Sequence, residues 1–437
     1  MVDVRRRLRP ERRVARYAWP AALGATWLAW YGADSLRHRR ESGHGYDLRG
    51  ELDVRSPRFL RAAEALTGAP ISNGSEVELL INGDQIFPSY LETIASAQKT
   101  LCLLTYVYWR GEIAHDVARA LCERARAGVE CNVLIDSVGG MKLERELIDK
   151  MAGAGVRVVR FRPVRPYAVK RLANRTHRKI LVADGRLGLT GGVGIAEEWT
   201  GNAEDPDHWR DTHVRVRGPI ARGLFGAFAE NWLEATGEVL AGEGYLPELE
   251  ELEDGGPMMV VRSSAGVGDS NIEAMYYLAI AAARESLDLT AAYFAPRPAF
   301  IEALQDASER GARVRVLVPG QHIDKPPVWI AGRASYDELI DAGVEIYEYQ
   351  PTMLHAKTLT VDGCWSAVGS ANFDNRSFQL NDEATLCVSS SAFARRLTEQ
   401  FERDLAVSER IRPERWRSRG PLQRTGEATL KLVRREL

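Results

Sequence analysis

Two segments of the chain repeat one spacing of a histidine, a lysine and an aspartate. The first segment reads THRKILVADGRLGLTGG and the second reads LHAKTLTVDGCWSAVGSAN, so each contains H-x-K-x4-D. The residues are His177, Lys179 and Asp184 in the first motif, and His355, Lys357 and Asp362 in the second. Only eight of the 58 basic residues are lysines. One lysine in each motif therefore suggests a chemical requirement.

The spacing suits chemistry at phosphorus. Alternate side chains of a strand share one face, so the histidine and lysine of each motif project together. Lysine acts there as a compact charge on the non-bridging phosphate oxygens. One histidine can attack phosphorus while the other protonates the leaving oxygen, because the two roles need opposite protonation states. The pattern predicts a two-step phosphodiester transfer through a phosphohistidine, without assigning the two roles.

Each imidazole also needs a carboxylate that fixes its tautomer and orientation. The aspartates inside the motifs, Asp184 and Asp362, lie past a turn and could instead make structural salt bridges. Better-placed candidates lie on the strands that follow, Asp211 in WRDTHVRV and Glu383 in NDEATLCV. We count all four as candidate catalytic groups, together with the two histidines and two lysines.

Small residues follow both motifs and predict close approach of a phosphate. Gly191, Gly192, Ser370 and Asn372 would let backbone and side-chain donors reach the substrate. No metal or cofactor is predicted, because the other histidines lack metal-ligand spacing and the five cysteines form no C-x-x-C pair.

The elements that must position these residues alternate between strand and helix. Expected strands are Glu76–Ile81, Leu101–Tyr108, Cys131–Asp136 and Val156–Phe161, and expected helices are Pro88–Ala97, Ile113–Ala127 and Leu143–Ala154. Such alternation predicts a mixed sheet covered by helices on both faces.

The series then begins again. Ala125–Asp136 (ARAGVECNVLID) recurs as Ser308–Pro319 (SERGARVRVLVP), and Gly155–Phe161 (GVRVVRF) recurs as Gly343–Tyr349 (GVEIYEY). Both H-x-K-x4-D motifs fall at equivalent places in this duplication. We therefore predict an α/β protein of two similar α/β/α halves, related by a pseudo-two-fold axis, with one active site at their interface.

The chain is expected to divide into six segments. They are a basic N-terminal segment with a short membrane anchor (1–45), a connector (46–74), a first half (75–245), an acidic linker (246–258), a second half (259–408) and a basic amphipathic tail (409–437).

Three segments suggest contact with membranes, and each also has a plainer interpretation. The uncharged run Tyr17–Ala33 follows seven arginines and is at the short end of what crosses a bilayer, so it predicts a short span or an interfacial anchor; the alternative is a soluble helix. The tail could lie on a membrane surface or be a solvated helix. The loop with Arg165, Lys170, Arg171 and Arg175 could gather anionic head groups or be an ordinary solvated loop.

From about Val77 onward the sequence resembles the bacterial cardiolipin synthases of the phospholipase D superfamily. The most specific stretches are THRKILVADGRLGLTGG, HWRDTHVRVRGP, AYFAP and YEYQPTMLHAKTLTVDGCWSAVGSANFDNRSF. The resemblance implies a duplicated phospholipase D fold and metal-independent transfer of a phosphatidyl group from one phosphatidylglycerol to a second, releasing glycerol. It implies His177 as the nucleophile, His355 as the general acid and base, membrane phospholipids as partners, and the bacterial inner membrane as location.

One residue departs from the family pattern. Gly194 stands where the first half of family members usually has an asparagine, whereas Asn372 keeps that amide in the second half. Three alternatives stay open on the sequence: a hydrolytic phospholipase D, a nuclease, and a non-catalytic membrane scaffold. A nucleic-acid partner is not favoured, because the net charge is only −2.

Overall fold

Short runs rich in β-branched and apolar residues form two mixed β-sheets in the computed structural model. The structure describes residues 46–164, 174–253, 255–265 and 270–418. Within these ranges, the four strands and three helices expected for the first half are all present, with ends shifted by a few residues. Hydrophobic periodicity was therefore a sufficient guide to the elements.

The first half is built on a seven-stranded sheet in the order β1-β8-β7-β6-β2-β3-β4. The strands are β1 (Glu76–Ile81), β2 (Thr100–Thr105), β3 (Glu130–Asp136), β4 (Arg157–Phe161), β6 (Ile180–Ala183), β7 (Leu187–Gly191) and β8 (Thr212–Arg217). The helices are α3 (Asn82–Ser96), α4 (Glu112–Arg126), α5 (Arg145–Gly153) and α6 (Ala221–Thr236). One core lies between the sheet and α3 to α5, and another lies under α6.

The second half repeats this plan on a nine-stranded sheet. Eight of its strands come from this half: β9 (Met258–Ser263), β10 (Ser286–Ala291), β12 (Arg313–Pro319), β13 (Glu345–Tyr349), β14 (Lys357–Val361), β15 (Trp365–Gly369), β17 (Asn381–Ser389) and β18 (Ser408–Arg410). The ninth, β5 (Arg175–Thr176), comes from the first half. Its helices are α7 (Asn271–Ala282), α8 (Pro298–Glu309), α9 (Pro326–Arg333), α10 (Tyr336–Asp341), α11 (Asn375–Gln379) and α12 (Ser391–Ala406). A short ladder, β11 (Phe294–Ala295) with β16 (Phe373–Asp374), lies off this sheet.

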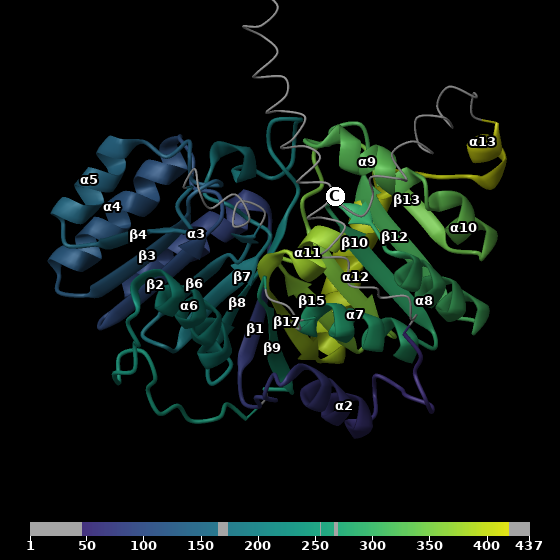
Figure 1. Cartoon of the computed structure of the whole chain (residues 1–437), viewed down its shortest axis with the longest axis horizontal. Coiled ribbons are helices and arrows are strands. Elements are labelled where there is room, and N and C mark those ends of the chain that lie inside the picture. Colours follow the sequence, from purple (N-terminus) through teal and green to yellow (C-terminus); the bar gives the residue numbers. More distant parts are fainter. Residues whose placement is uncertain (1–45, 165–173, 254, 266–269, 419–437) are drawn as a thin grey trace, which may run out of the picture. The chain divides into compact units, whose positions relative to one another are not determined.

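The predicted duplication is confirmed by strand direction. In the first half β2, β3 and β4 run parallel and β6 returns antiparallel to β2. In the second half β10, β12 and β13 run parallel and β14 returns antiparallel to β10. Strands β7 and β8 of the first half contact β15 of the second half, and β7 also contacts β17 (Figure 1). The two halves meet along these strands.

Each half also gives a short segment to the other. The two-residue strand β5 (Arg175–Thr176) leads into His177, yet it pairs with β17 of the second half. In the reverse direction, Leu354 precedes His355 and forms a parallel bridge with Arg210 of the first half. Both motif histidines therefore sit on backbone that has joined the opposite half.

Two predicted boundaries shift because apolar residues on either side of them are buried. Leu52, Val54 and Phe59 of the expected connector join the core of the second half, and helix α2 (Pro57–Thr67) packs on α7 (Figure 1). Beyond residue 408, β18 extends the second sheet next to β13, and Trp416 of helix α13 (Pro413–Arg417) is 4% exposed. Residues of the connector and the start of the tail are thus part of the second half.

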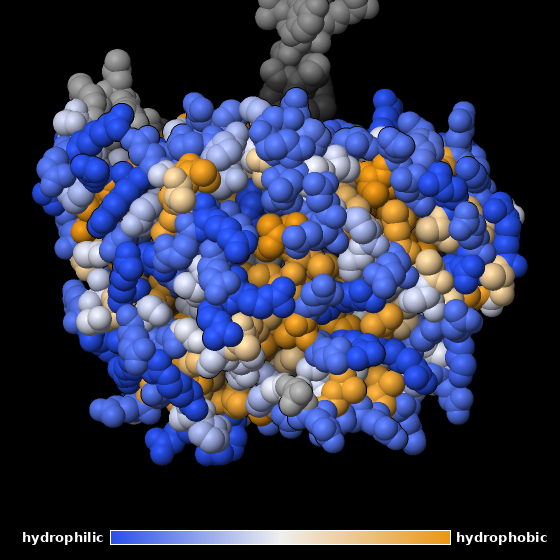
Figure 2. All heavy atoms as spheres, turned by 180° about the vertical axis from the view of Figure 1, so that it is seen from behind, coloured by the Kyte–Doolittle hydropathy of each residue, from blue (hydrophilic) through white to orange (hydrophobic). Residues whose placement is uncertain are grey.

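The segment predicted to meet the membrane, 1–45, lies outside the described residues, as does the tail after residue 418. Among the helices that are described, none is both long and apolar enough to cross a bilayer. On the face seen in Figure 2, hydrophobic residues appear between hydrophilic ones. Scattered exposure of this kind is normal for a folded domain.

The burial of Trp416 generates a stability prediction. Its ring lies 5.1 Å from that of Tyr336, and the Arg333 guanidinium carbon lies 4.7 Å from its centroid. We expect Trp416→Ala to lower the free energy of unfolding by about 3–5 kcal/mol, because it opens a cavity in the core. Val407→Ala, at a residue 47% exposed, should change it by less than about 0.5 kcal/mol. Urea unfolding followed by circular dichroism tests both, and equal midpoints would contradict the placement of Trp416.

Candidate active site

The two motif histidines lie at the interface, and each is paired with a carboxylate from the opposite half. His177 Nδ1 lies 3.1 Å from both carboxylate oxygens of Glu383 on β17. His355 Nδ1 lies 2.7 Å from Asp211 Oδ2, immediately before β8. The structure thus brings together the four residues that the sequence nominated for these roles. The crossing between halves was not predicted.

The orienting carboxylates are themselves fixed by hydrogen bonds. Asp211 accepts from the Trp199 indole N–H at 2.9 Å and from the backbone N–H of Thr212 at 2.7 Å. Glu383 accepts from the Ser370 hydroxyl at 2.5 Å. These contacts hold each carboxylate against Nδ1, which favours a proton on that nitrogen. The Nε2 atom of each ring is then the one available to react.

Both motif lysines are buried beside the histidines. Lys179 Nζ donates to the His177 carbonyl oxygen at 2.7 Å, and Lys357 Nζ donates to that of His355 at 2.5 Å. Lys357 Nζ also lies 3.0 Å from His355 Nε2. Burial and the charge of the other lysine lower the pKa of Lys179 to about 7, and burial lowers that of Lys357 to about 8. The charge of the two lysines, which Asp211 and Glu383 partly offset, favours an anionic ligand at the site.

The imidazoles are neutral near pH 7 for the same reason. Burial, opposed by Glu383 and reinforced by the lysines, lowers the pKa of His177 to about 4. Burial and the charge of Lys357 also hold the pKa of His355 well below its usual value. Glu383 keeps a pKa below the ordinary glutamate value, because His177 and Lys179 outweigh its burial. The unliganded site is therefore a neutral histidine pair beside two lysines and two carboxylates.

The four small residues predicted to contact phosphate have different environments. A Cβ atom on Gly192 would lie 2.1 Å from Asp211 Oδ1, and the Gly192 N–H donates to the Thr212 carbonyl. A Cβ on Gly191 would lie 2.5 Å from the Thr212 carbonyl oxygen. Both glycines therefore make room for the β8 segment that carries the orienting carboxylate.

On the second half, Ser370 bonds to Glu383, as described above. The neighbouring Asn372 is 5% exposed, and its Oδ1 has no hydrogen-bond partner among the described residues. Of the four, Asn372 is the residue with a buried side-chain atom that has no hydrogen-bond partner among the described residues.

The unusual Gly194 has a steric explanation. A Cβ atom there would lie 2.7 Å from Val107 Cβ and 3.2 Å from a ring carbon of Trp199. Trp199 in turn donates to Asp211, so the indole occupies space next to the site. An asparagine at this position would displace one of these two side chains.

The two motif aspartates lie away from the histidines. Asp184 accepts hydrogen bonds of 2.7–2.8 Å from three consecutive backbone amides at Gln98, Lys99 and Thr100. The whole of β6 separates it from His177, which is roughly 13 Å of extended chain. Its contacts are those of a brace at the start of β2.

Asp362 repeats this arrangement in the second half. It accepts from the backbone amides of Arg284, Glu285 and Ser286, at the start of β10. Both aspartates also have a positive φ, +52° and +50°, which asparagine and aspartate tolerate better than other side chains. The contacts therefore support the structural alternative rather than membership of the catalytic group.

Several aromatic residues near the histidines were missed or left open by the sequence. The rings of Trp199, Trp209 and Tyr293 have centroids 5.2, 5.6 and 6.3 Å from that of His355. Tyr106 lies 5.4 Å from His177. Trp199 follows the first motif in the sequence. No spacing rule linked the other three to the site.

The basic loop before His177 is only partly described. Arg175 is 3% exposed, its Nη1 donates to the Arg162 carbonyl, and it lies 3.7 Å from Asp136 Oδ1. It therefore belongs neither to a basic lip nor to a solvated loop. Arg165, Lys170 and Arg171 lie outside the described residues.

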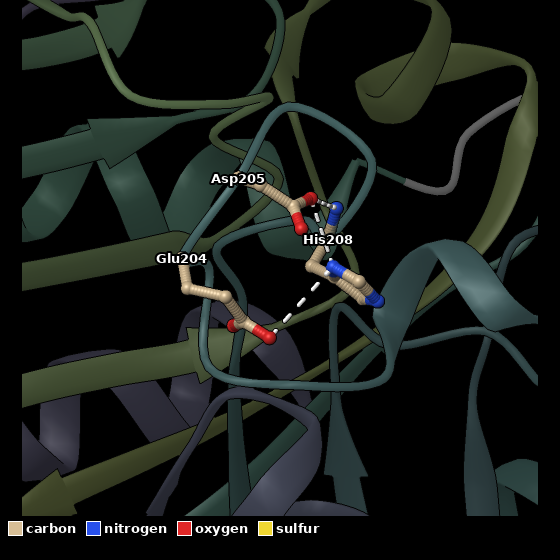
Figure 3. Close-up of side chains that lie close together, drawn as sticks. All are labelled: Glu204, Asp205 and His208. Carbon is tan, nitrogen blue, oxygen red and sulfur yellow. Dashed lines mark hydrogen bonds and ion pairs between the residues drawn. The ribbon is translucent and has the colours of Figure 1, made fainter.

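Within the described ranges, one group of side chains has the composition of a metal site. Glu204, Asp205 and His208 lie close together on an exposed loop (Figure 3). His208 Nδ1 is 2.8 Å from Asp205 Oδ1 and 3.8 Å from Glu204 Oε1. These ion pairs account for the cluster without a metal.

Comparison with known proteins places this geometry in a family. The sequence profile described as "Cardiolipin synthase, PLD-like domain" matches residues 90–205 and 276–405, and each match contains one H-x-K-x4-D motif. The chain belongs to this family. It is 34% identical to a cardiolipin synthase of Geobacillus kaustophilus, over 86% of this chain and 75% of that one. It is also 34% identical to cardiolipin synthase 2 of Bacillus anthracis, over 86% of this chain and 73% of the relative.

A solved structure supports the fold. Phosphatidylserine synthase from Haemophilus influenzae superposes with a TM-score of 0.64 at 14% identity, covering 87% of this chain and all of that one. At this identity the likeness concerns the fold alone. The sequence comparisons thus show the cardiolipin synthase family with two phospholipase D-like matches, and the solved structure supports the fold.

The backbone contacts of the motif aspartates yield a prediction. Asp184→Ala and Asp362→Ala each leave three amides without their acceptor, so each should lower the free energy of unfolding by about 1–3 kcal/mol. The kcat of the folded enzyme should change little, because neither carboxylate contacts a histidine. Urea unfolding and active-site-normalised rates test this. A large loss of kcat with unchanged stability would restore these residues to the catalytic group.

The lowered lysine pKa values yield a second prediction. The side-chain amines of Lys179 and Lys357 are expected to bind phosphate only when they are protonated. The kcat/KM should therefore fall as the pH rises through about 7 and about 8. On the acid side kcat/KM should stay constant down to the pKa of His177, about 4, because this imidazole has to be neutral to attack phosphorus. The arginine of Lys179→Arg keeps its charge throughout this pH range. In this variant kcat/KM should therefore fall only near pH 8, where Lys357 loses its proton. Initial rates on short-chain lipid in micelles measure this, and identical alkaline limbs in both proteins would refute the assignment.

Proposed function

We propose that this protein is a cardiolipin synthase that transfers a phosphatidyl group from one phosphatidylglycerol to a second and releases glycerol. The observation that carries the proposal is the paired site: two histidines, each with an orienting carboxylate from the opposite half, beside two buried lysines. The names of the relatives supply the product, cardiolipin, and the site supplies the chemistry.

In the first step, His177 Nε2 attacks the phosphorus atom of the donor lipid. The P–N bond forms as the bond from phosphorus to the glycerol head-group oxygen breaks, and His355 gives that oxygen its proton. A neutral imidazole is a better nucleophile than a charged one, and a pKa of about 4 keeps His177 neutral near pH 7. The anionic phosphate raises the pKa of His355 when it binds, which supports protonation of the acid.

In the second step, the head-group hydroxyl of a second phosphatidylglycerol attacks the phosphohistidine. His355, now neutral, takes the hydroxyl proton as the P–N bond breaks and the electron pair returns to His177. Lys179, Lys357 and Asn372 are proposed to bind the phosphate oxygens in both steps. The negative charge that develops on those oxygens is stabilised in a site with little water.

Membrane association belongs to the same proposal. A lipid acceptor must reach a site at the interface of the halves, and the basic and apolar N-terminal segment would hold the enzyme at the bilayer. The bacterial inner membrane is the proposed location. This part of the proposal rests on the sequence of residues 1–45 and on the lipid product that the names of the relatives print.

The decisive experiment follows lipid products from phosphatidylglycerol vesicles in the presence of EDTA. Wild-type protein should form cardiolipin and glycerol in equal amounts, and His177→Ala should form neither. Glu383→Gln should lower kcat by about 10²- to 10⁴-fold with a smaller effect on KM, because loss of an orienting carboxylate leaves the imidazole in the wrong tautomer. Acid-labile radiolabel from a phosphorus-labelled donor should be trapped on protein with an intact His177.

The controls separate the alternatives. Asp184→Asn, which keeps the turn, serves as a matched carboxylate change outside the site. Phosphatidic acid as the sole product would replace the synthase with a hydrolase. Absence of lipid turnover in wild-type protein would contradict the proposal as a whole.

A further inference from the structure

A buried ion pair joins the two halves next to His355. Arg210 lies just before β8 in the first half, and Asp404 lies on α12 in the second. Arg210 Nη2 is 2.8 Å from Asp404 Oδ2 and Arg210 Nε is 3.0 Å from Asp404 Oδ1, so the contact is bidentate. The two side chains are 4% and 7% exposed. Gln400 adds a third hydrogen bond to the carboxylate, at 3.0 Å.

Arg210 is connected to both members of the His355–Asp211 pair. Its carbonyl oxygen accepts the backbone N–H of His355 at 2.7 Å, and it directly precedes Asp211 in the chain. Its Nη1 also donates to the Asp211 carbonyl oxygen and, at 2.9 Å, to the Thr212 hydroxyl. The guanidinium therefore ties α12 to the backbone from which both the acid and its orienting carboxylate project.

A buried charged residue also precedes the carboxylate that pairs with His177, but this residue is acidic. Asp382 directly precedes Glu383, and its carbonyl oxygen accepts the backbone N–H of His177 at 2.8 Å. Its carboxylate accepts from Asn231 Nδ2 on α6 at 2.9 Å and lies 3.2 Å from Arg162 Nη2. In both cases a buried charged residue precedes the orienting carboxylate and is anchored on the opposite half.

We propose that the Arg210–Asp404 pair is a positioning device that sets His355 against Asp211. Stability alone is a weak reason to bury such a pair, because desolvation of two charges offsets most of their attraction. What the fork geometry supplies is a fixed distance and angle between α12 and the β8 segment. A shift of about 1 Å in a reacting group costs as much as about 10²-fold in rate.

The chain contains a matched control pair. Arg315 on β12 and Asp288 on β10 also form a bidentate contact, at 2.6 and 2.9 Å, with side chains 6% and 5% exposed. None of the contacts described for this pair involves a histidine or an orienting carboxylate. It has the chemistry and burial of the proposed device, and Arg315 Nη1 also contacts Glu402 on α12 at 2.6 Å. The pair therefore tests attachment to this helix without a link to His355 or Asp211.

The test replaces each pair by apolar residues of similar size, as Arg210→Met with Asp404→Leu and, separately, Arg315→Met with Asp288→Leu. The kinetic readout rests on the proposed synthase activity. The first double variant should lose about 10- to 100-fold in kcat with KM within about twofold, and the second should keep the wild-type kcat. Their urea midpoints should differ little from each other. Equal kcat values in the two double variants would overturn the proposal.

A spectroscopic readout keeps this inference separate from the proposed function. The Nδ1–H proton of His355, bonded to Asp211, gives a low-field resonance in protein with ¹⁵N-labelled histidine, identified by its loss in His355→Asn. This resonance should shift or broaden in the Arg210–Asp404 double variant and stay unchanged in the control. An unchanged resonance overturns the inference, whereas a wild-type protein that makes no cardiolipin overturns only the function.

Arg210→Lys covers the case in which the double variant does not fold. It keeps the buried charge but loses the fork, so it should retain stability and still lower kcat. Wild-type kcat in Arg210→Lys, together with an unchanged His355 resonance, would reduce the pair to a structural contact.

Discussion

The crossing of histidines and carboxylates between the halves is the constraint on which the site depends. Each imidazole is oriented by a group that belongs to the other half, with contacts of 2.7 Å at His355 and 3.1 Å at His177. Neither half contains a complete catalytic unit. The strands that carry these residues therefore have to be held in register across the interface, which explains why β5 pairs with β17 and why Arg210 pairs with Leu354.

Burial gives the site its electrostatic character. Two lysines, two imidazoles and two carboxylates are buried together, where burial lowers the lysine pKa values and opposite charges keep Glu383 ionised. Without a bound anion this arrangement carries a free-energy cost, because two charged lysines are buried near each other. In the proposed mechanism a phosphodiester bound by the lysines relieves that cost, so that substrate binding helps to set the protonation state of the histidines.

The residues around the site support it in two ways: some fix the backbone by hydrogen bonds, and others leave space for side chains of the site. Asp184 and Asp362 each collect three amides at the start of a central strand, and so act on the sheet rather than on the substrate. Gly192 and Gly194 leave the space that Asp211 and Trp199 occupy. The H-x-K-x4-D pattern therefore combines a reactive end with a structural end, separated by the length of one strand. This accounts for its fixed spacing in both halves.

The sequence by itself determined the elements and the duplication, and it nominated the histidines, the lysines and the two carboxylates that the structure brings together. It could do so because strand periodicity and the needs of imidazole chemistry are local properties of residue type and spacing. Only the tertiary structure decided which carboxylate serves which histidine, that Trp199, Trp209 and Tyr293 surround His355, and that Arg210 reaches Asp404. These contacts join residues far apart in the chain, and they depend on how two similar halves pack. The burial of Leu52 and Trp416 in the second half was hidden for the same reason, since the core that receives them forms only after the sheets assemble.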